Sequence, residues 1–225
     1  MHDVQRNYTT IKKQILLACQ QANKNSENIK LLAVSKGRDL AHIKSLLAKG
    51  QLDFGENKAQ EAVDKIISLS NTNIIWHFIG PIQSNKAKII SEHFQWTHSL
   101  DRLKIASLLN KHRPKTLSPL NVCVQVNIDQ EPQKSGILPC DLEQFISELI
   151  KLDNLRLRGL MCIPKKSTNS TVNRETYLQV AQIYNHYAKD YDFDTLSMGM
   201  STDFPEAIAS GANLIRIGTA LFGPK

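Results

Sequence analysis

The sequence predicts an α/β protein with one closed (β/α)8 barrel of the TIM type, and three observations carry this prediction. Eight short apolar segments alternate with segments whose apolar residues recur at helical spacing. The apolar segments start roughly 20 to 40 residues apart, which leaves room for a helical crossover between parallel strands. No Pro-, Gly- or Ser-rich tract divides the 225 residues. We therefore expect one domain over residues 1–225, with a parallel sheet and right-handed crossovers.

Eight strands in a chain of this length favour closure of the sheet into a barrel, with an extra N-terminal helix that completes the outer ring. In chain order, the expected elements are helix 4–23, strand 31–36, helix 39–49, strand 52–55, helix 57–69, strand 74–79, helix 84–93, strand 94–99, helix 101–112, strand 122–128, helix 139–151, strand 155–162, helix 174–190, strand 194–198, helix 203–210 and strand 213–217. An open, doubly wound sheet is the alternative. It predicts a GxGxxG turn after the first strand, and the segment 35–38 is not such a turn.

Each element rests on a local signal. Apolar residues three or four positions apart predict the helices, as Ile11 and Ile15 do for the first one, and Gly50 is a C-cap signal for the second. The strands are short apolar runs bounded by polar residues or glycine. The fifth strand alternates apolar and polar residues instead, and a polar loop over 164–173 precedes the longest of the helices that follow the strands.

Composition excludes several classes of protein. Hydrophobic residues make up 41% and charged residues 22%, which suits a globular protein with a core. The net charge of +7 is spread along the chain without a nucleic-acid motif, so a solvated basic surface is expected, and an anionic ligand is compatible with it. Four scattered cysteines favour reduced thiols over a disulfide framework or a metal site. With no signal peptide or membrane span visible, we expect a cytoplasmic protein.

Lys36 is the first candidate for chemistry, because it stands at the end of the first apolar strand and before Gly37. An ammonium at the rim of a core is costly unless it is paired or used. Lysine forms Schiff bases with carbonyl compounds once its amine is available. A lysine that only extends into solvent is the alternative.

The loops after the last two strands point to a phosphate, because barrels often bind one there. Ser201 precedes a helix and is a candidate N-cap or phosphate donor. After the eighth strand, Gly218 lets an anion approach the backbone, and Thr219 adds a hydroxyl. An ordinary cap and an ordinary tight turn are the alternatives. A phosphate together with a rim lysine suggests a phosphate ester that carries an aldehyde, and pyridoxal 5′-phosphate is the candidate.

Seven motifs carry a resemblance to a known family. They are Ala33-Val34-Ser35-Lys36, Phe54-Gly55-Glu56-Asn57, the segment 76–86 (WHFIGPIQSNK), Lys134-Ser135-Gly136, Arg158-Gly159-Leu160-Met161, Met198-Gly199-Met200-Ser201 with Asp203, and Arg216-Ile217-Gly218-Thr219. In this order they resemble the pyridoxal phosphate homeostasis protein family, single-domain relatives of the alanine racemase N-terminal barrel (fold type III of the pyridoxal phosphate proteins). The resemblance covers essentially the whole chain, and the segment 76–86 is its most specific part.

The resemblance implies the roles of seven residues. Lys36 matches the lysine that holds pyridoxal 5′-phosphate as an internal aldimine. The positions that match the family's phosphate-binding residues are Ser201, Gly218 and Thr219, those near the ring are Asn57 and Ile79, and the arginine that faces the pyridine nitrogen is Arg216. Arginine stays protonated and can only donate, so the ring nitrogen would remain unprotonated and the ring would be a poorer electron sink.

Other residues have weaker or different expectations. Gly37 stands where the family commonly has threonine, and the tyrosine that holds the phosphate in alanine racemase has no counterpart shortly after Lys36. His77 is expected to be a hydrogen-bonded core histidine rather than a base. Glu56 is expected to be a carboxylate at a helix N-terminus. Lys134 is a candidate for a second anion site.

We therefore expect a monomeric barrel that binds pyridoxal 5′-phosphate and holds, buffers or delivers it, with apoenzymes that depend on this cofactor as recipients. An amino-acid racemase with the same cofactor, a Schiff-base aldolase acting on a sugar phosphate, and a basic nucleic-acid-binding protein are the alternatives. Little racemase activity is expected. Alanine racemase takes its second base from an additional C-terminal domain, whereas this sequence ends at Lys225, shortly after the last strand.

Overall fold

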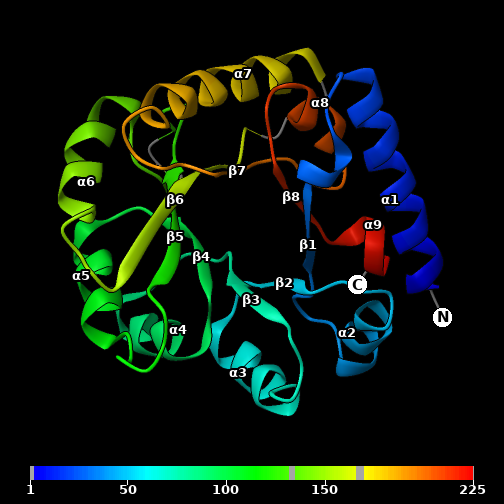
Figure 1. The fold of residues 1–225 in the computed structure, drawn as a ribbon, viewed down its shortest axis with the longest axis horizontal. Helices are drawn as coiled ribbons and strands as arrows, with labels where there is room; N and C mark the ends of the chain where they lie inside the picture. The colour runs from blue at the N-terminus through cyan, green and yellow to red at the C-terminus, as the bar shows by residue number, and fades with distance from the viewer. Residues whose placement is uncertain (1–2, 132–134, 166–169, 225) are drawn as a thin grey trace.

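The computed structural model describes residues 3–131, 135–165 and 170–224, and it confirms the closed parallel barrel. The strands are β1 (Lys30–Val34), β2 (Asp53–Glu56), β3 (Ile75–Phe78), β4 (Trp96–Leu100), β5 (Leu120–Val126), β6 (Leu155–Cys162), β7 (Thr195–Ser197) and β8 (Leu214–Ile217). Each strand pairs in parallel with the next, and β8 closes the sheet by pairing with β1, with Ala33 opposite Ile217 (Figure 1). All carboxyl ends of the strands therefore meet at one rim.

Helices surround the barrel (Figure 1). They are α1 (Val4–Gln21), α2 (Leu40–Leu47), α3 (Ala59–Ser68), α4 (Ala87–His93), α5 (Leu103–His112), α6 (Leu142–Leu149), α7 (Ser170–Tyr187), α8 (Phe204–Ala209) and α9 (Thr219–Phe222), with 3₁₀ turns at Ser26–Asn28, Ser84–Lys86 and Pro139–Asp141. As expected, α1 completes the outer ring, where it packs against α2, α8 and α9. No helix in the described ranges is both long and apolar enough to cross a membrane.

The structure corrects several expected boundaries. The first strand ends at Val34, so Lys36 lies in the following turn rather than in the strand. The fifth strand covers 120–126 instead of 122–128, because the backbone at Asn127 turns to pair with Ile137. The long helix α7 begins at Ser170, within the expected polar loop, of which 166–169 lie outside the described residues. The short helix α9 was not expected.

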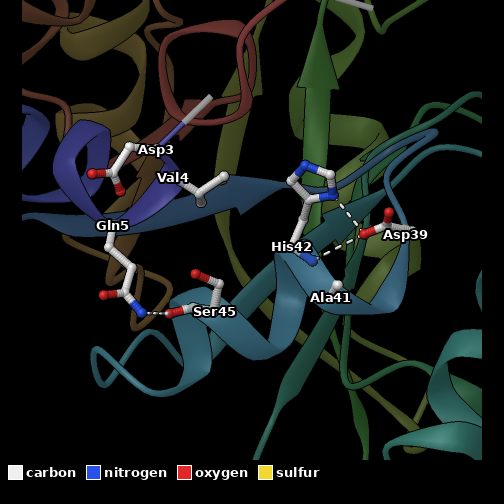
Figure 2. A pocket seen from close by; sticks show the side chains of 7 residues that line it. All are labelled: Asp3, Val4, Gln5, Asp39, Ala41, His42 and Ser45. Carbon is white, nitrogen blue, oxygen red and sulfur yellow. Dashed lines mark hydrogen bonds and ion pairs between the residues drawn. The ribbon is translucent and has the colours of Figure 1, made fainter. Parts of the chain in front are cut away.

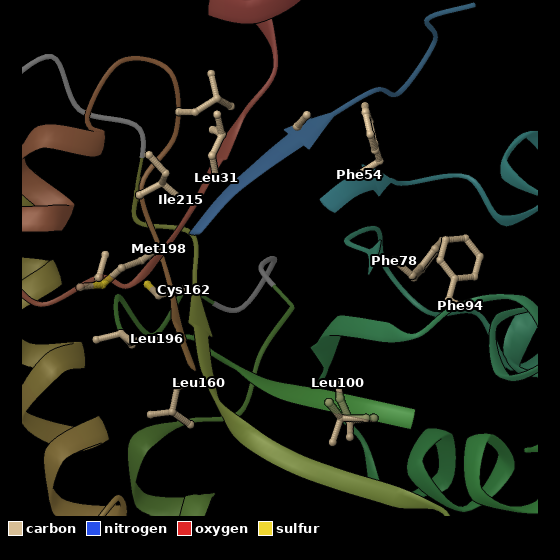
Figure 3. Packing of buried hydrophobic residues seen from close by; sticks show 14 of the residues in the cluster. Leu31, Phe54, Phe78, Phe94, Leu100, Leu160, Cys162, Leu196, Met198 and Ile215 are labelled. Carbon is tan, nitrogen blue, oxygen red and sulfur yellow. The ribbon is translucent and has the colours of Figure 1, made fainter. Parts of the chain in front are cut away.

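Buried side chains divide between two regions. The barrel-to-helix shell, which we define as the apolar layer between the strands and the outer helices, includes Leu31, Phe54, Phe78, Leu160 and Ile215 (Figure 3). The barrel interior holds the alternate residues of the strands. Its apolar side chains include Leu32 and Leu214, which alternate with shell residues on β1 and β8, and a separate small cluster of Trp96, Cys123 and Met161. The rest of the interior includes buried polar side chains, notably His77, His98, Ser197 and Arg216.

The amino-terminal face of the barrel is closed by a cation over an aromatic ring. The guanidinium of Arg158 lies 4.7 Å from the centre of the Trp96 ring and also pairs with Asp194. Lys30 lies 5.8 Å from the same ring and 3.6 Å from the carboxylate of Asp53. These contacts are typical of the stabilising face of a barrel, opposite the rim where active sites form.

Candidate functional site

Lys36 lies in a tight turn that follows β1. The turn closes through a hydrogen bond of 3.0 Å from the Arg38 amide to the Ser35 carbonyl. Gly37 has a φ of 66°, in the left-handed region that glycine adopts without steric cost. Its amide donates to the Glu61 carboxylate at 2.9 Å. The Lys36 side chain is exposed at the rim, so its amine is accessible on a fixed piece of backbone.

A buried ion pair of Glu56 and Lys65 contacts this turn at Ser35. Glu56 is fully buried at the end of β2, and its Oε1 accepts hydrogen bonds from the Ser35 hydroxyl at 2.6 Å and from Lys65 at 2.9 Å. Lys65 also donates to the Ser35 carbonyl at 3.1 Å and reaches Glu61 at 3.4 Å. Burial raises the pKa of Glu56, against the lowering effect of Lys65 and Ser35. The expected role of Glu56 at a helix N-terminus is wrong, because its side chain binds α3 through Lys65.

The loops after β7 and β8 converge at the start of α9. Gly218 is the N-cap of this helix and Thr219 its first residue. The Ala220 amide donates to the Ser201 hydroxyl at 3.3 Å, which brings the two loops into contact. The first amides of a helix have no acceptor within the helix, so this end presents N–H groups beside the hydroxyls of Ser201 and Thr219. The loop after β7 is held by Asp203, whose carboxylate accepts from the Met200 amide at 2.7 Å.

Arg216 lies on β8, two residues before Gly218, and its side chain is buried in the barrel interior. Its Nη1 donates to the Ser197 carbonyl at 2.8 Å and to the Ser197 hydroxyl at 2.9 Å. Its Nη2 donates to the Cys162 carbonyl at 3.0 Å. Within the described ranges, Nε makes no hydrogen bond, so the guanidinium is clamped at one end and keeps a donor at the other.

A chain of hydrogen bonds runs from Arg216 through the interior. The Ser197 hydroxyl contacts His98 Nδ1 at 2.8 Å, and His98 Nε2 contacts His77 Nδ1 at 2.9 Å. His77 Nε2 then contacts the Asp53 carboxylate at 3.0 Å. The prediction that His77 is a satisfied core histidine is confirmed. Sequence reasoning missed Ser197, His98 and Asp53, although the polar residues at inward positions of buried strands were a usable signal.

Asn57 and Ile79 lie on the rim on the other side of Lys36. Their loops are held together at Gly80, where an added Cβ would lie 2.3 Å from the Asn57 carbonyl oxygen, so only glycine fits. The Ile79 amide donates to the Glu56 carbonyl at 2.8 Å. Ile79 also lines a cavity of about 190 Å³ that reaches across the mouth to Gln125. The segment 76–86 therefore contributes Ile79 to the rim, and its Gly80 packs against the backbone of Asn57.

The rim residues expected from the sequence are thus neighbours in the barrel. The loops that carry them follow β7, β8, β1, β2 and β3, which are consecutive around the closed sheet. Lys134, the candidate for a second anion site, lies outside the described residues. In the described part of the chain, no group of three or more His, Cys, Asp or Glu side chains could hold a metal ion.

A cavity of about 510 Å³ lies between the start of α1 and the start of α2 (Figure 2). Its two carboxylates already cap helices, since Asp3 accepts from the Arg6 amide and Asp39 from the His42 amide. The remaining lining residues include Val4, Ala41 and Ser45. Both carboxylates of this cavity are therefore engaged in helix capping.

Comparisons with known proteins agree with this geometry. The model of the alanine racemase N-terminal domain family matches residues 7–225. The pyridoxal phosphate homeostasis protein of Pseudomonas aeruginosa is 45% identical over 225 residues, which are 100% of this chain and 97% of that protein. The one from Escherichia coli strain K12 is 43% identical over 229 residues, with 100% and 98% covered.

Solved structures give the same result. PipY of Synechococcus elongatus PCC7942, solved with PLP bound, is 32% identical, with a TM-score of 0.86 over 98% of this chain and 100% of that one. Alanine racemase from E. faecalis is 14% identical, with a TM-score of 0.70 over 99% of this chain and 59% of that one, and this likeness concerns the fold alone. The chain therefore belongs to the pyridoxal phosphate homeostasis protein family, within the wider family of alanine racemase N-terminal domains.

Proposed function

We propose that this protein binds pyridoxal 5′-phosphate covalently through Lys36 and acts in its homeostasis by holding, buffering or delivering it. The observation that carries the proposal is the juxtaposition at one rim of an exposed amine, a helix start flanked by two hydroxyls, and a clamped arginine. The relatives named for pyridoxal phosphate homeostasis and the PLP-bound PipY support the same reading.

The donor set fits this cofactor. The ligand carries a dianionic phosphate, and the first amides of α9 with Ser201 and Thr219 supply uncharged donors for it. Gly218 lies close to Val34 of β1, since an added Cβ would lie 3.4 Å from the Cβ of Val34. Arg216 has an uncommitted Nε within the described ranges, which suits an acceptor such as an unprotonated ring nitrogen. We assign Asn57 and Ile79 to the ring.

The roles of the residues follow from this assignment. When bound, the cofactor supplies an aldehyde and an electron-accepting ring. Lys36 supplies the attacking amine, on a turn fixed by Glu61, and the rim leaves that amine open to solvent. An arginine that can only donate keeps the ring nitrogen unprotonated and restrains carbanion chemistry. These features suit storage and release. All assigned groups come from one chain, so we propose a monomer that delivers the cofactor to apoenzymes at this open rim.

The test is the absorption spectrum of the purified protein with added pyridoxal 5′-phosphate, followed by borohydride reduction and peptide mapping. We expect a reducible linkage on Lys36 that Lys36→Ala abolishes, with unchanged thermal stability. Lys58→Ala is the matched control, because Lys58 is another exposed lysine beside the same rim. A full spectrum in Lys36→Ala with the adduct on another lysine would overturn the assignment. A sugar phosphate trapped on Lys36 in place of the cofactor would favour the aldolase.

The racemase alternative is tested separately, and we expect little or no activity. Racemisation needs acid–base groups on both faces of the substrate α-carbon. In the part of the chain that the structure describes, Tyr8 lies on α1, while Tyr177, Tyr184 and Tyr187 lie on α7. Tyr191, which the sequence places on the same helix, follows its end and packs against Phe193. A missing base costs a factor of about 10²–10⁴. Incubation of the loaded protein with each L-amino acid in deuterated water should give at most trace D-enantiomer. Rapid turnover that depends on Lys36 would promote the racemase.

A further inference from the structure

The hydrogen-bonded chain through the barrel interior connects the rim arginine to the opposite half of the barrel. It joins Arg216, Ser197, His98, His77 and Asp53 through contacts of 2.9, 2.8, 2.9 and 3.0 Å. Both imidazoles and Ser197 are fully buried, and the His77 ring stacks on Trp96 with centroids 5.4 Å apart. The chain comes from five strands that are distant in sequence, and the proposed function uses only its Arg216 end.

The two end groups, Arg216 and Asp53, determine in which direction each hydrogen bond between them is donated. A guanidinium can only donate and an ionised carboxylate can only accept. Burial alone would raise the pKa of Asp53, but the hydrogen bond from His77 and the charge of Lys30 lower it overall. Burial lowers the pKa of both His77 and His98, so the two rings are neutral. His77 then donates from Nε2 to Asp53, His98 from Nε2 to His77, and Ser197 from its hydroxyl to His98.

This direction of the hydrogen bonds determines that the Ser197 hydroxyl presents its oxygen, and not its hydrogen, to Arg216. Its single proton is committed to His98, so its oxygen lone pairs face Nη1. Together with the carbonyls of Ser197 and Cys162, they hold both terminal nitrogens. If the proton were not committed, the hydroxyl could rotate and present its hydrogen to the guanidinium instead. The orientation of Arg216 therefore depends on residues of β2, β3 and β4, on the other side of the barrel interior.

We propose that Ser197, His98, His77 and Asp53 are positioning residues that fix the guanidinium of Arg216 so that its free donor meets the ring nitrogen of the bound cofactor. This inference rests on the proposed function. Of the five hydrogen-bonded residues, only Arg216 would contact the cofactor. The alternative is that these polar groups merely satisfy one another inside the barrel, in which case their removal changes stability but not the recognition of the ring nitrogen.

The first experiment compares the dissociation constants of pyridoxal 5′-phosphate and its N-methylpyridinium derivative, whose ring nitrogen cannot accept a hydrogen bond. Wild type should prefer the unmethylated cofactor. Ser197→Ala should reduce this preference by about tenfold, which is the loss of one hydrogen bond to a charged group. Ser197→Thr keeps the hydroxyl and should restore it. Cys123→Ala, also buried in the interior but outside the chain, is the control and should leave the preference unchanged.

The second experiment needs no cofactor. Nitrogen-15 NMR of the free protein at pH 7.5 should find both His77 and His98 neutral with the proton on Nε2, and Ser197→Ala should perturb the His98 Nδ1 signal. A charged histidine ring, or a proton on Nδ1 instead of Nε2, would contradict the proposed direction of the hydrogen bonds. If wild type binds the cofactor but Ser197→Ala keeps its full preference, only this inference fails. If wild type does not bind the cofactor, the proposed function and this inference fail together.

Discussion

The barrel-to-helix shell and the barrel interior follow different packing rules. The shell is a continuous apolar layer with fully buried residues such as Phe54 and Ile215. The interior holds the cluster around Trp96, aliphatic side chains such as Leu32 and Leu214, and a line of polar groups that ends at Arg216. Barrels usually fill this space with branched aliphatic residues. The difference indicates that the shell supplies most of the stability, and it leaves the polar part of the interior free for the positioning role that we propose.

The largest effect should come from the shell. Phe54→Ala removes a fully buried ring and should lower the free energy of unfolding by about 3–5 kcal/mol, through lost burial and the cavity left behind. Denaturant unfolding measures this. Ile67→Ala is the control, because the Ile67 side chain is 61% exposed and should change stability by less than about 0.5 kcal/mol. Equal losses in the two variants would contradict the assignment of the shell.

The buried pair of Glu56 and Lys65 is an ion pair within the mainly apolar shell, and it sharpens the comparison. Lys65→Met leaves a fully buried carboxylate without its cation and should cost about 3 kcal/mol of stability. Adding Glu56→Gln should recover part of that loss, because the charge is then gone. Thermal and denaturant unfolding of the two single variants and the double variant complete the cycle. Additive losses would show that the pair is not coupled.

The proposed phosphate site, formed by Ser201, Thr219 and the first amides of α9, should tolerate loss of its side chains better than the shell does. Ser201→Ala combined with Thr219→Ala should weaken binding of pyridoxal 5′-phosphate by about 1–3 kcal/mol in total, since the backbone amides of α9 remain. Titration of the absorption spectrum gives the dissociation constant. Thr202→Ala is a nearby control, because Thr202 is exposed in the same loop. An unchanged constant in the double variant would place the phosphate elsewhere.

The buried histidines of the interior should make the free energy of unfolding depend on pH. Burial lowers the folded-state pKa of His77 and His98 below the ordinary 6.5, so the folded protein binds fewer protons than the unfolded chain in this range. Stability is then complete above pH 6.5 and is lost as pH falls, by at most about 1.4 kcal/mol per pH unit for each histidine. Denaturant unfolding from pH 7.5 to 5.5 measures the slope.

The control for this slope is His98→Gln, whose amide can replace both hydrogen bonds. It should lower the slope by about half, because one of the two titrating rings is gone. Glu56 has a raised pKa and contributes with the opposite sign, but both proteins retain it, so its effect cancels in the comparison. An unchanged slope would show that His98 is not held neutral in the folded protein.

The sequence by itself determined the fold and the rim. Periods of two and 3.6 residues locate strands and helices, because alternate burial is imposed locally by backbone geometry. Strand ends can be read the same way, and their loops meet in a closed parallel barrel, so Lys36 and Arg216 were identifiable. The errors lie at boundaries, such as the start of α7, and at α9, where four residues are too few to show a period.

Only the tertiary structure decided how the polar residues pair. Asp53, His77, His98 and Ser197 are separated by up to 99 residues between hydrogen-bonded neighbours, and their contact depends on the register and shear of the closed sheet. The same holds for Glu56, whose partner Lys65 is chosen by the way α3 packs on the barrel. A residue type states what a side chain can donate or accept, but its partner depends on distances that only the assembled barrel defines.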